Sequence, residues 1–144
     1  MNQAWSEAWP VDIRSNISFF HSKVKEVPGP DNRLDQQPSM TANLGADYRL
    51  RGLPLTLGGN VNWNPDYDTR RSQEQSSYQG IKRVVDVYGQ WRYSAATALR
   101  LTVSNLLPRD YETATTFSSG GASETARTTD RNWRNVQLRL EMKI

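Results

Sequence analysis

The chain has 144 residues, of which 36% are hydrophobic and 23% are charged, with a formal net charge of +3 and no cysteine. This length suits one domain of modest size, and the lack of cysteine excludes disulfide frameworks, thiolate zinc sites and cysteine nucleophiles. Mean hydropathy is -0.76, and no apolar run approaches the roughly 18 residues of a membrane helix. Residues 1–10 do not have the basic start and apolar stretch of a secretory signal. The averages alone predict a polar, soluble and mildly basic protein.

Apolar and polar residues alternate with a period of two along most of the chain, which is typical of β-strands with two unlike faces. No long window has the apolar spacing of an amphipathic helix. The alternating runs, in chain order, are Val11–Phe19, Met40–Leu50, Leu53–Trp63, Val85–Tyr93, Leu99–Ser104 and Val136–Ile144. We therefore predict an all-β fold, an antiparallel up-and-down meander of about six long strands.

The connections between these runs alternate in length. Arg51-Gly52, followed by Pro54, and Ser94-Ala95-Ala96 form the two short turns. Three longer connections, at residues 25–38, 65–82 and 108–131, are rich in Pro, Gly, Ser, Thr or charge. In a meander this places short turns at one end and long loops at the other. Long loops with no secondary structure of their own are uncommon in compact soluble domains.

Three features favour a strand system that crosses a membrane. Each run is long enough, at about 3.3 Å per residue and tilted, to cross an apolar band roughly 25 Å tall. The polar face carries charged and amide side chains at strand centres, as a water-filled lumen would. Aromatic residues gather near both ends of the runs: Trp9, Tyr48, Trp91 and Tyr93 toward the short turns, and Phe19, Phe20, Trp63, Tyr67, Tyr111 and Trp133 toward the long loops. The pattern predicts part of a transmembrane β-barrel; a soluble meander whose aromatics cap a core is the alternative.

Several segments resemble the late barrel of a TonB-dependent outer-membrane receptor. They are residues 34–50, residues 52–60 followed by Trp63 and Pro65, residues 83–88, and the closing stretch 133–144. The most specific match is residues 99–111, where Asn105-Leu106 precedes a short charged stretch and Tyr111. The resemblance extends from about Trp9 to Ile144. One departure is Ile144, because the terminal residue of this family is usually Phe or Trp.

The resemblance implies that residues 1–144 are the C-terminal portion of a receptor barrel, covering about the last six of roughly 22 strands. The expected function is energy-coupled uptake of a scarce nutrient such as a ferric siderophore. The C-terminus would be periplasmic and the long loops extracellular, in the outer membrane of a Gram-negative cell. Expected partners are outer-membrane lipid, the plug and remaining barrel strands, TonB through an N-terminal region absent from this sequence, and the barrel-assembly machinery. The absent signal peptide and plug suggest a piece of a longer protein.

The same resemblance implies roles for three groups of residues. Ligand contacts in the extracellular loops would come from Tyr67, Arg70, Arg71, Tyr78 and Tyr111. Inward polar residues packing against the plug would be Asp86, Gln90, Arg100 and Arg139. The signal for the barrel-assembly machinery would be Leu138, Leu140, Met142 and Ile144.

Catalytic and metal-binding residues are sparse. His21 is the single histidine, Asp66 and Asp68 are too few oxygen ligands for a calcium site, and no constellation for hydrolysis surrounds His21. Gly58-Gly59 and Gly120-Gly121 lack the context of a phosphate loop; we expect the first to thin or bend a strand and the second to be a flexible loop tip. Basic residues alternate with carboxylates, so nucleic-acid binding is not expected. We predict no enzyme activity and no cofactor.

Two other functions fit the alternation. One is a small independent or oligomeric outer-membrane barrel, acting as a pore or an adhesin, although an open sheet of six strands cannot stand alone in hydrocarbon. The other is a soluble β-sheet binding module. An outer-membrane lipid-modifying enzyme is the least favoured, because catalytic residues are lacking.

Overall fold

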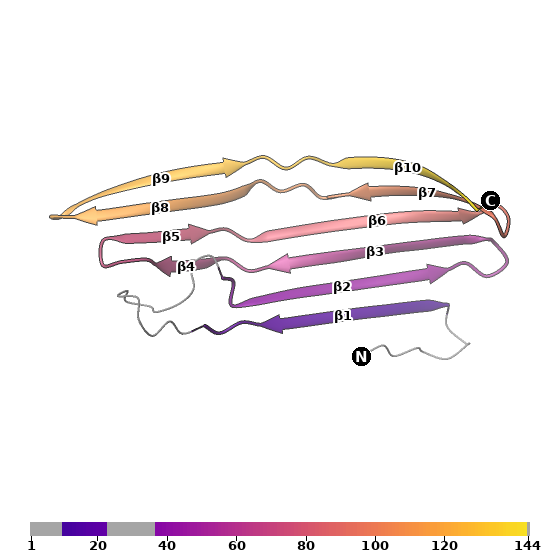
Figure 1. The fold of residues 1–144 in the computed structure, drawn as a ribbon, viewed down its shortest axis with the longest axis horizontal. Helices are drawn as coiled ribbons and strands as arrows, with labels where there is room; N and C mark the ends of the chain where they lie inside the picture. The colour runs from indigo at the N-terminus through magenta and orange to yellow at the C-terminus, as the bar shows by residue number, and fades with distance from the viewer. Residues whose placement is uncertain (1–9, 23–36, 144) are drawn as a thin grey trace.

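The computed structural model describes residues 10–22 and 37–143, and all regular secondary structure in those residues is β-strand (Figure 1). Ten antiparallel strands form two sheets. Their bounds are β1 Val11–Phe19, β2 Met40–Arg49, β3 Leu55–Asn64, β4 Tyr67–Arg70, β5 Gln75–Gln79, β6 Lys82–Arg92, β7 Thr97–Ser104, β8 Tyr111–Ser119, β9 Ala122–Asp130 and β10 Asn135–Met142. The all-β, antiparallel prediction is confirmed, with ten strands in place of about six.

The larger sheet contains the six predicted strands, in the order β1-β2-β3-β6-β7-β10. The two short turns lie at the same end of this sheet, as predicted (Figure 1). The Leu50 N–H donates to the Leu55 carbonyl at 2.9 Å, and the Tyr93 N–H donates to the Thr97 carbonyl at 3.0 Å. Gly52 has φ 79° in the first turn, a left-handed conformation that glycine adopts without a Cβ clash.

The smaller sheet, of order β4-β5-β8-β9, corrects the prediction of long irregular loops. Residues 65–82 and 108–131 contain two β-hairpins, which continue beyond the larger sheet on the side away from the short turns (Figure 1). Gly120 and Gly121 have φ 60° and 84°, and two positive φ angles are those of a type I′ hairpin turn. The expected flexible loop tip is therefore a tight turn. Of the connection at residues 25–38, all but residues 37 and 38 lies outside the described residues.

One pairing register holds across all six strands of the larger sheet and gives it two unlike faces. Because side chains alternate along a strand, residues that are directly paired share a face. One central row of paired residues is Ile13, Ala46, Gly59, Val87, Val103 and Val136. The next row is Val11, Tyr48, Leu57, Gly89, Leu101 and Leu138. We call this the apolar face and its opposite the polar face.

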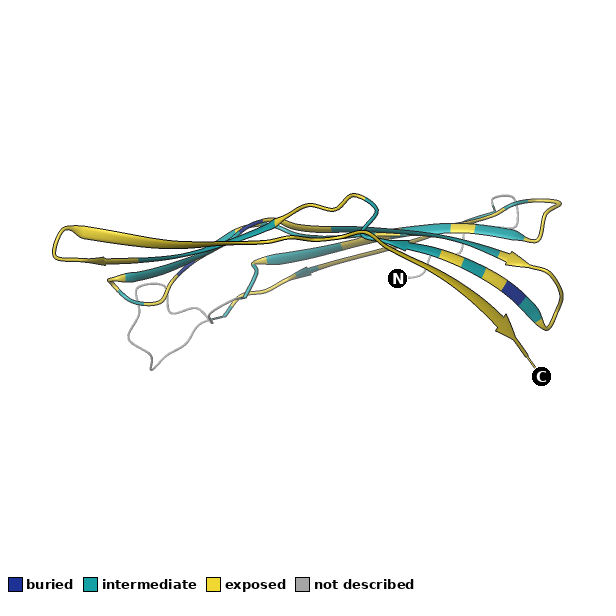
Figure 2. Ribbon diagram, turned by 90° about the horizontal axis from the view of Figure 1, so that it is seen from above, coloured by how far each residue is buried: buried dark blue, intermediate teal, exposed yellow. Residues whose placement is uncertain are grey.

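The described strands form a single twisted layer with no covering second layer (Figure 2). Only Thr69, Gly80 and Ala98 are buried among the described residues. Large apolar side chains are left exposed instead, including Leu44 at 54%, Leu101 at 47% and Leu138 at 66%. Within residues 10–22 and 37–143, no helix is both long and apolar enough to cross a membrane.

The larger sheet is open. Among the described strands, β1 pairs only with β2, and β10 pairs only with β7. Each therefore has one edge whose backbone N–H and C=O groups are not paired in a sheet.

Candidate functional site

The centre of the polar face holds an interlocked group of side chains from four strands, which we call the polar cluster: Arg14, Asp47, Tyr88 and Arg100. The Tyr88 hydroxyl donates to Asp47 Oδ1 at 2.6 Å, and the Arg14 guanidinium forms an ion pair with Asp47. The Arg100 guanidinium carbon lies 3.9 Å from the centroid of the Tyr88 ring, within the range of a cation–π contact. The Asp47 side chain is only 14% exposed, so its charge is well covered by these partners.

Gly58 makes room for this cluster. A Cβ atom added to Gly58 would lie 2.5 Å from the Tyr88 ring and closer still to the Asp47 carboxylate. Real Cβ atoms do not approach other heavy atoms so closely, so only glycine lets the Tyr88 ring lie across β3 toward Asp47 on β2. The sequence predicted that Gly58-Gly59 thins or bends a strand. In the structure β3 is thin at Gly58, where the missing Cβ leaves room for the Tyr88 ring.

A hollow of about 580 Å³ lies beside the cluster on the polar face. Its lining combines amides, hydroxyls and charges, including Asn16, Asn43, Asn60, Asp86, Thr102 and Ser104. Asn16 pairs directly with Asn43, and Asn43 with Asn62. The polar face thus offers both donors and acceptors to water or to a polar partner.

All four predicted lumen residues lie on the polar face. Gln90, Arg100 and Arg139 are consecutive members of one row across β6, β7 and β10, while Asp86 lies farther toward the hairpins on β6. Two of them contribute to the wall itself: Arg100 stacks on Tyr88, and Asp86 accepts a backbone hydrogen bond from Asn105. Their predicted contact with a plug stays a prediction.

Asn105 marks the point where the chain leaves the larger sheet. It has φ 53°, an uncommon conformation for a residue other than glycine. Its N–H donates to Asp86 Oδ1 at 2.9 Å, and its Nδ2 donates to the Trp133 carbonyl at 3.1 Å. The Asn105-Leu106 motif therefore connects β6, the end of β7 and the segment before β10.

Replacing Asp86 by alanine is expected to destabilise the folded chain by about 1–3 kcal/mol, because the Asn105 N–H loses a charged acceptor. Asn105→Gly keeps the left-handed backbone and loses only the contact with Trp133, so a smaller effect is expected. Urea unfolding of both variants, followed by circular dichroism in detergent, measures the difference. Equal stability of Asp86→Ala and the parent chain would contradict this role.

The predicted ligand-contact residues divide between the two faces of the smaller sheet. Tyr67 and Tyr111 line a hollow of about 220 Å³ at the junction of the two sheets, together with Gln79 and Lys82. Lys82 Nζ lies 5.7 Å from the Tyr111 ring centroid, and the Tyr67 hydroxyl bonds to Gln79. Arg71, directly after β4, lines a second hollow together with Tyr67 and Tyr78, and with Ser77 and Thr113. The pairing register places Arg70 and Tyr78 at positions facing the other side from Tyr67.

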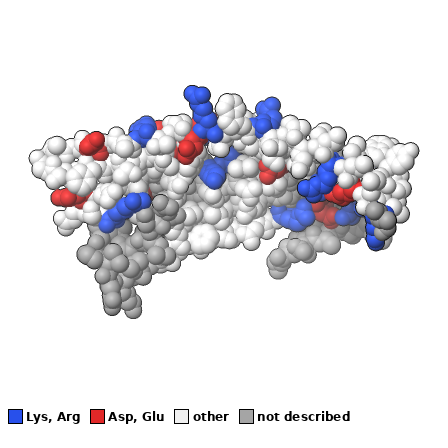
Figure 3. Space-filling view, turned by 45° about the horizontal axis from the view of Figure 1, so that its top comes forward, with Lys and Arg blue, Asp and Glu red and all other residues white. Residues whose placement is uncertain are grey.

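The side chains of the smaller sheet also include an ion pair, with Arg127 Nη1 2.9 Å from Glu112 Oε1. On the face drawn in Figure 3, basic and acidic side chains are interspersed and form no continuous basic stripe. Within residues 10–22 and 37–143, no group of three or more His, Asp or Glu side chains is arranged to hold a metal ion.

No family model matches the chain, and no solved structure matches it significantly.

Sequence reasoning missed the polar cluster as a unit and missed both outer hairpins. Tyr88 is on the predicted polar side of its strand, but its contacts with Asp47 and Gly58 depend on how β6 pairs with β3 across the insertion at residues 65–82. The hairpins did have a signal. Tyr111, Thr113, Thr115, Thr116 and Phe117 are residue types that favour β-strands, and the turn signal Gly120-Gly121 follows them.

The pKa of the Tyr111 phenol is raised above its ordinary value of 10.0, by partial burial and by the charge of Asp130, its cross-strand partner. A raised folded-state pKa stabilises the fold below the ordinary value, and this contribution is lost as pH rises through the folded-state pKa. We expect Tyr111→Phe to reduce the loss of stability seen above about pH 10. Unfolding midpoints of the two chains between pH 8 and pH 12 test this; identical pH profiles would contradict it.

Proposed function

We propose that the chain forms part of the wall of an outer-membrane β-barrel of the TonB-dependent receptor type, which takes up a scarce nutrient such as a ferric siderophore by energy coupling. The larger sheet would span the membrane, with the short turns on the periplasmic side. The two hairpins would lie on the extracellular side. The observation that carries the proposal is the apolar face, which stays in one register across six strands and is left exposed.

An exposed apolar face of this size is unfavourable in water. Monomeric soluble proteins rarely expose a contiguous apolar patch larger than a few hundred Å², and the rows described above cross all six strands. Lipid solvates such a face, while the polar face with its charged cluster would be turned to a water-filled lumen. A soluble module would need a second layer over the apolar face, and the described part of the chain has none (Figure 2).

The positions of aromatic side chains support the same orientation in a membrane. Tyr48, Trp91 and Tyr93 lie near the short turns and are 45%, 40% and 83% exposed. Phe19 and Trp63 lie at the opposite ends of their strands. Aromatic side chains at both interfaces are typical of outer-membrane barrels. Trp9, expected in the same belt, lies outside the described residues.

The final strand fits the proposed assembly signal. Leu138, Leu140 and Met142 lie on the apolar face of β10 and are 66%, 58% and 67% exposed. Ile144, the last residue of the signal, lies outside the described residues.

Folding in detergent tests the membrane part of the proposal. Far-UV circular dichroism of the whole chain is expected to show cooperative β structure in detergent micelles and to lose it in plain buffer. Equally stable β structure in plain buffer would favour the soluble binding module and overturn the proposal.

The uptake part requires a receptor that contains this segment. There, Tyr67→Ala and Tyr111→Ala are expected to weaken binding of the nutrient, because both tyrosines line the hollow between the two sheets. Thr129→Ala is the matched control, since its partner Glu112 is adjacent to Tyr111 and therefore on the opposite face. Unchanged affinity in both tyrosine variants would remove the ligand-contact role.

A further inference from the structure

A charged side chain interrupts the apolar face of the larger sheet. In the described strands of this sheet, the apolar-face positions of β1, β2, β3, β7 and β10 hold no charge, and those of β6 hold only Arg83. Arg83 is exposed, and no carboxylate in the described part of the chain forms an ion pair with it. Its charge is therefore available to an anion from outside the described chain.

Arg83 lies at the level of the aromatic residues on the hairpin side of the sheet. It pairs directly with Trp63, in the row that also contains Ala42 and Ile17. The row near the short turns has no charge and consists of Leu55, Trp91, Leu99 and Leu140. On the lipid side of a barrel an arginine is costly at the bilayer midplane but is tolerated near the interface. In a membrane, Arg83 would thus lie among the lipid headgroups of the hairpin side.

A hollow of about 550 Å³ lies farther along the same face. Gly59 and Gly89 leave it open, because a glycine in a strand has no side chain and lets another molecule approach the backbone closely. Larger apolar side chains surround the two glycines: Tyr48, Leu57, Val87, Leu101 and Val103. The hollow lies mainly over β2, β3, β6 and β7, which are interior strands of the sheet, so its shape depends little on the two edge strands.

The spacing between Arg83 and the hollow suits a single lipid molecule. Val87 and Gly89 follow Arg83 on β6, roughly 13 and 20 Å away along the strand at about 3.3 Å per residue. With a strand tilt of about 40°, these distances correspond to a depth of roughly 10–15 Å. This is close to half of an apolar band about 25 Å tall, so an acyl chain whose headgroup contacts Arg83 would reach the hollow.

We propose that the apolar face binds one anionic membrane lipid, with its headgroup phosphate on Arg83 and an acyl chain in the hollow at Gly59 and Gly89. The planar guanidinium can donate two parallel hydrogen bonds to phosphate oxygens, and Trp63 adds an amphipathic ring at the same level. The acyl chain packs between the apolar side chains around the two glycines. This inference rests on the membrane part of the proposed function and adds a specific lipid site to it.

Lipid titration of the whole chain in detergent micelles tests the headgroup contact. Native mass spectrometry measures the affinities for phosphatidylglycerol and for phosphatidylcholine with the same acyl chains. Arg83→Gln is expected to lower the affinity for phosphatidylglycerol about fivefold, which corresponds to roughly 1 kcal/mol per basic residue at an anionic lipid surface. Arg83→Lys keeps the charge and should retain most of the affinity. Phosphatidylcholine has no net charge and should bind equally well to the parent chain and to Arg83→Gln.

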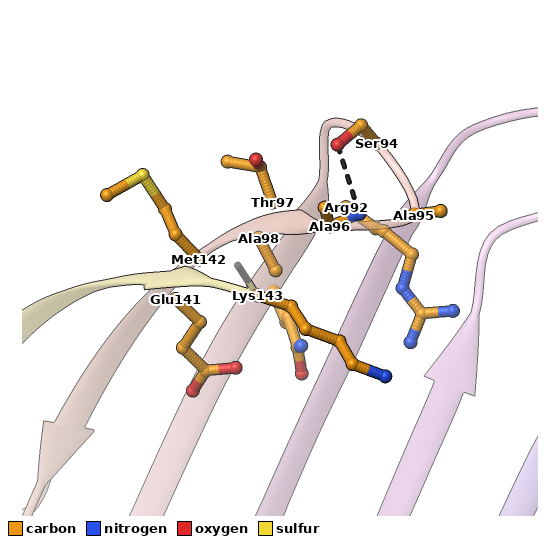
Figure 4. Close-up of a pocket in the computed structure, with 10 residues that line it drawn as sticks. Arg92, Ser94, Ala95, Ala96, Thr97, Ala98, Glu141, Met142 and Lys143 are labelled. Carbon is orange, nitrogen blue, oxygen red and sulfur yellow. Dashed lines mark hydrogen bonds between the residues drawn. The ribbon is translucent and has the colours of Figure 1, made fainter.

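Arg92→Gln is the matched control for the loss of charge. Arg92 lies at the short-turn end of the same strand and on the polar face, where it pairs with Ala98. In Figure 4 its side chain extends to the same side of the sheet as those of Glu141 and Lys143, while Met142 extends to the other side. Arg92→Gln should therefore bind phosphatidylglycerol as tightly as the parent chain does.

Filling the hollow tests the acyl-chain contact. A Cβ at Gly89 would meet its nearest atom, the flexible end of the Leu57 side chain, at 3.4 Å, so Gly89→Leu can be accommodated in the strand. It is expected to lower the affinity for both lipids at least threefold, since the acyl chain loses contacts with the lining side chains. Ser15→Leu adds the same side chain to the apolar face outside the hollow and should leave both affinities unchanged.

The outcomes separate this inference from the proposed function. Circular dichroism of the same samples shows whether β structure forms in detergent, and its absence overturns the membrane part and the lipid site together. With β structure present, equal affinities of the parent, Arg83→Gln and Gly89→Leu chains overturn the lipid site and leave the membrane wall standing. Equal losses in Arg83→Gln and Arg92→Gln, or full competition by inorganic phosphate, would show general anion attraction and also overturn the lipid site.

Discussion

Replacing Val103 by lysine is expected to prevent the larger sheet from folding into a membrane. Val103 lies in the central row of the apolar face, paired with Val87 on one side and Val136 on the other. A lysine on the lipid-facing side of a barrel near the bilayer midplane costs about 2–4 kcal/mol. Because many proteins have a total stability of only about 5–15 kcal/mol, one such substitution removes a large share of it.

The adjacent residue provides a matched control. Thr102 lies on the polar face, where it pairs with Tyr88 and Gln137, so Thr102→Lys places the same charge toward the lumen. We expect Thr102→Lys to fold in lipid vesicles with near-parental yield and Val103→Lys to fold poorly. The shift in gel mobility between heated and unheated samples measures the folded fraction. Equal folded fractions in the two variants would mean that the two faces do not meet different solvents.

The faces of the larger sheet could be predicted from the sequence because the relevant residues alternate strictly. Every second residue near the C-terminus is apolar, which predicts a strand with one apolar face. The structure places these residues on one face of β10: Val136, Leu138, Leu140 and Met142. The same alternation predicted that Asp86, Gln90, Arg100 and Arg139 share the opposite face. Local pattern alone fixes these results, since a strand side chain can point only to one face or the other.

The smaller sheet could not be predicted in the same way, because its two faces do not differ in polarity. In β8, Thr113, Thr115 and Thr116 include members of both faces, so the contrast between successive residues is weak. When strands are predicted from the difference in polarity between successive residues, a sequence of this kind is assigned to a loop. β8 and β9 form because the turn at Gly120-Gly121 brings them together and their backbone groups pair in a hairpin.

The polar cluster depends on long-range register and so was invisible to local pattern. Tyr88 meets Asp47 across β3 because Gly58 pairs with Tyr88 on one side and with Asp47 on the other. That coincidence joins residues 41 positions apart in the chain. Composition and spacing give the polarity of each position, but which glycine lies beneath which ring follows only from the assembled sheet.

Gly58→Ala is expected to destabilise the sheet by about 1–3 kcal/mol, the usual cost of adding a carbon to a tightly filled position. The new Cβ would lie 2.5 Å from the Tyr88 ring, so the ring must move and the hydrogen bond to Asp47 must lengthen or break. The Asp47 carboxylate would lose its phenol donor, and Arg100 would lose the ring on which it stacks. Urea unfolding in detergent micelles measures the change in the free energy of unfolding.

Two further variants show whether the Tyr88 ring is the cause. Gly45 lies one strand away on the same face, and a Cβ there would meet its nearest atom at 3.5 Å, which is ordinary contact. Gly45→Ala is therefore expected to leave stability within about 0.5 kcal/mol of the parent chain. In a chain that already carries Tyr88→Ala the ring is gone, so adding Gly58→Ala should cost much less than it does alone. If the cost of Gly58→Ala is the same with and without Tyr88, the glycine does not serve the ring, because a double-mutant cycle of residues in contact must show coupling.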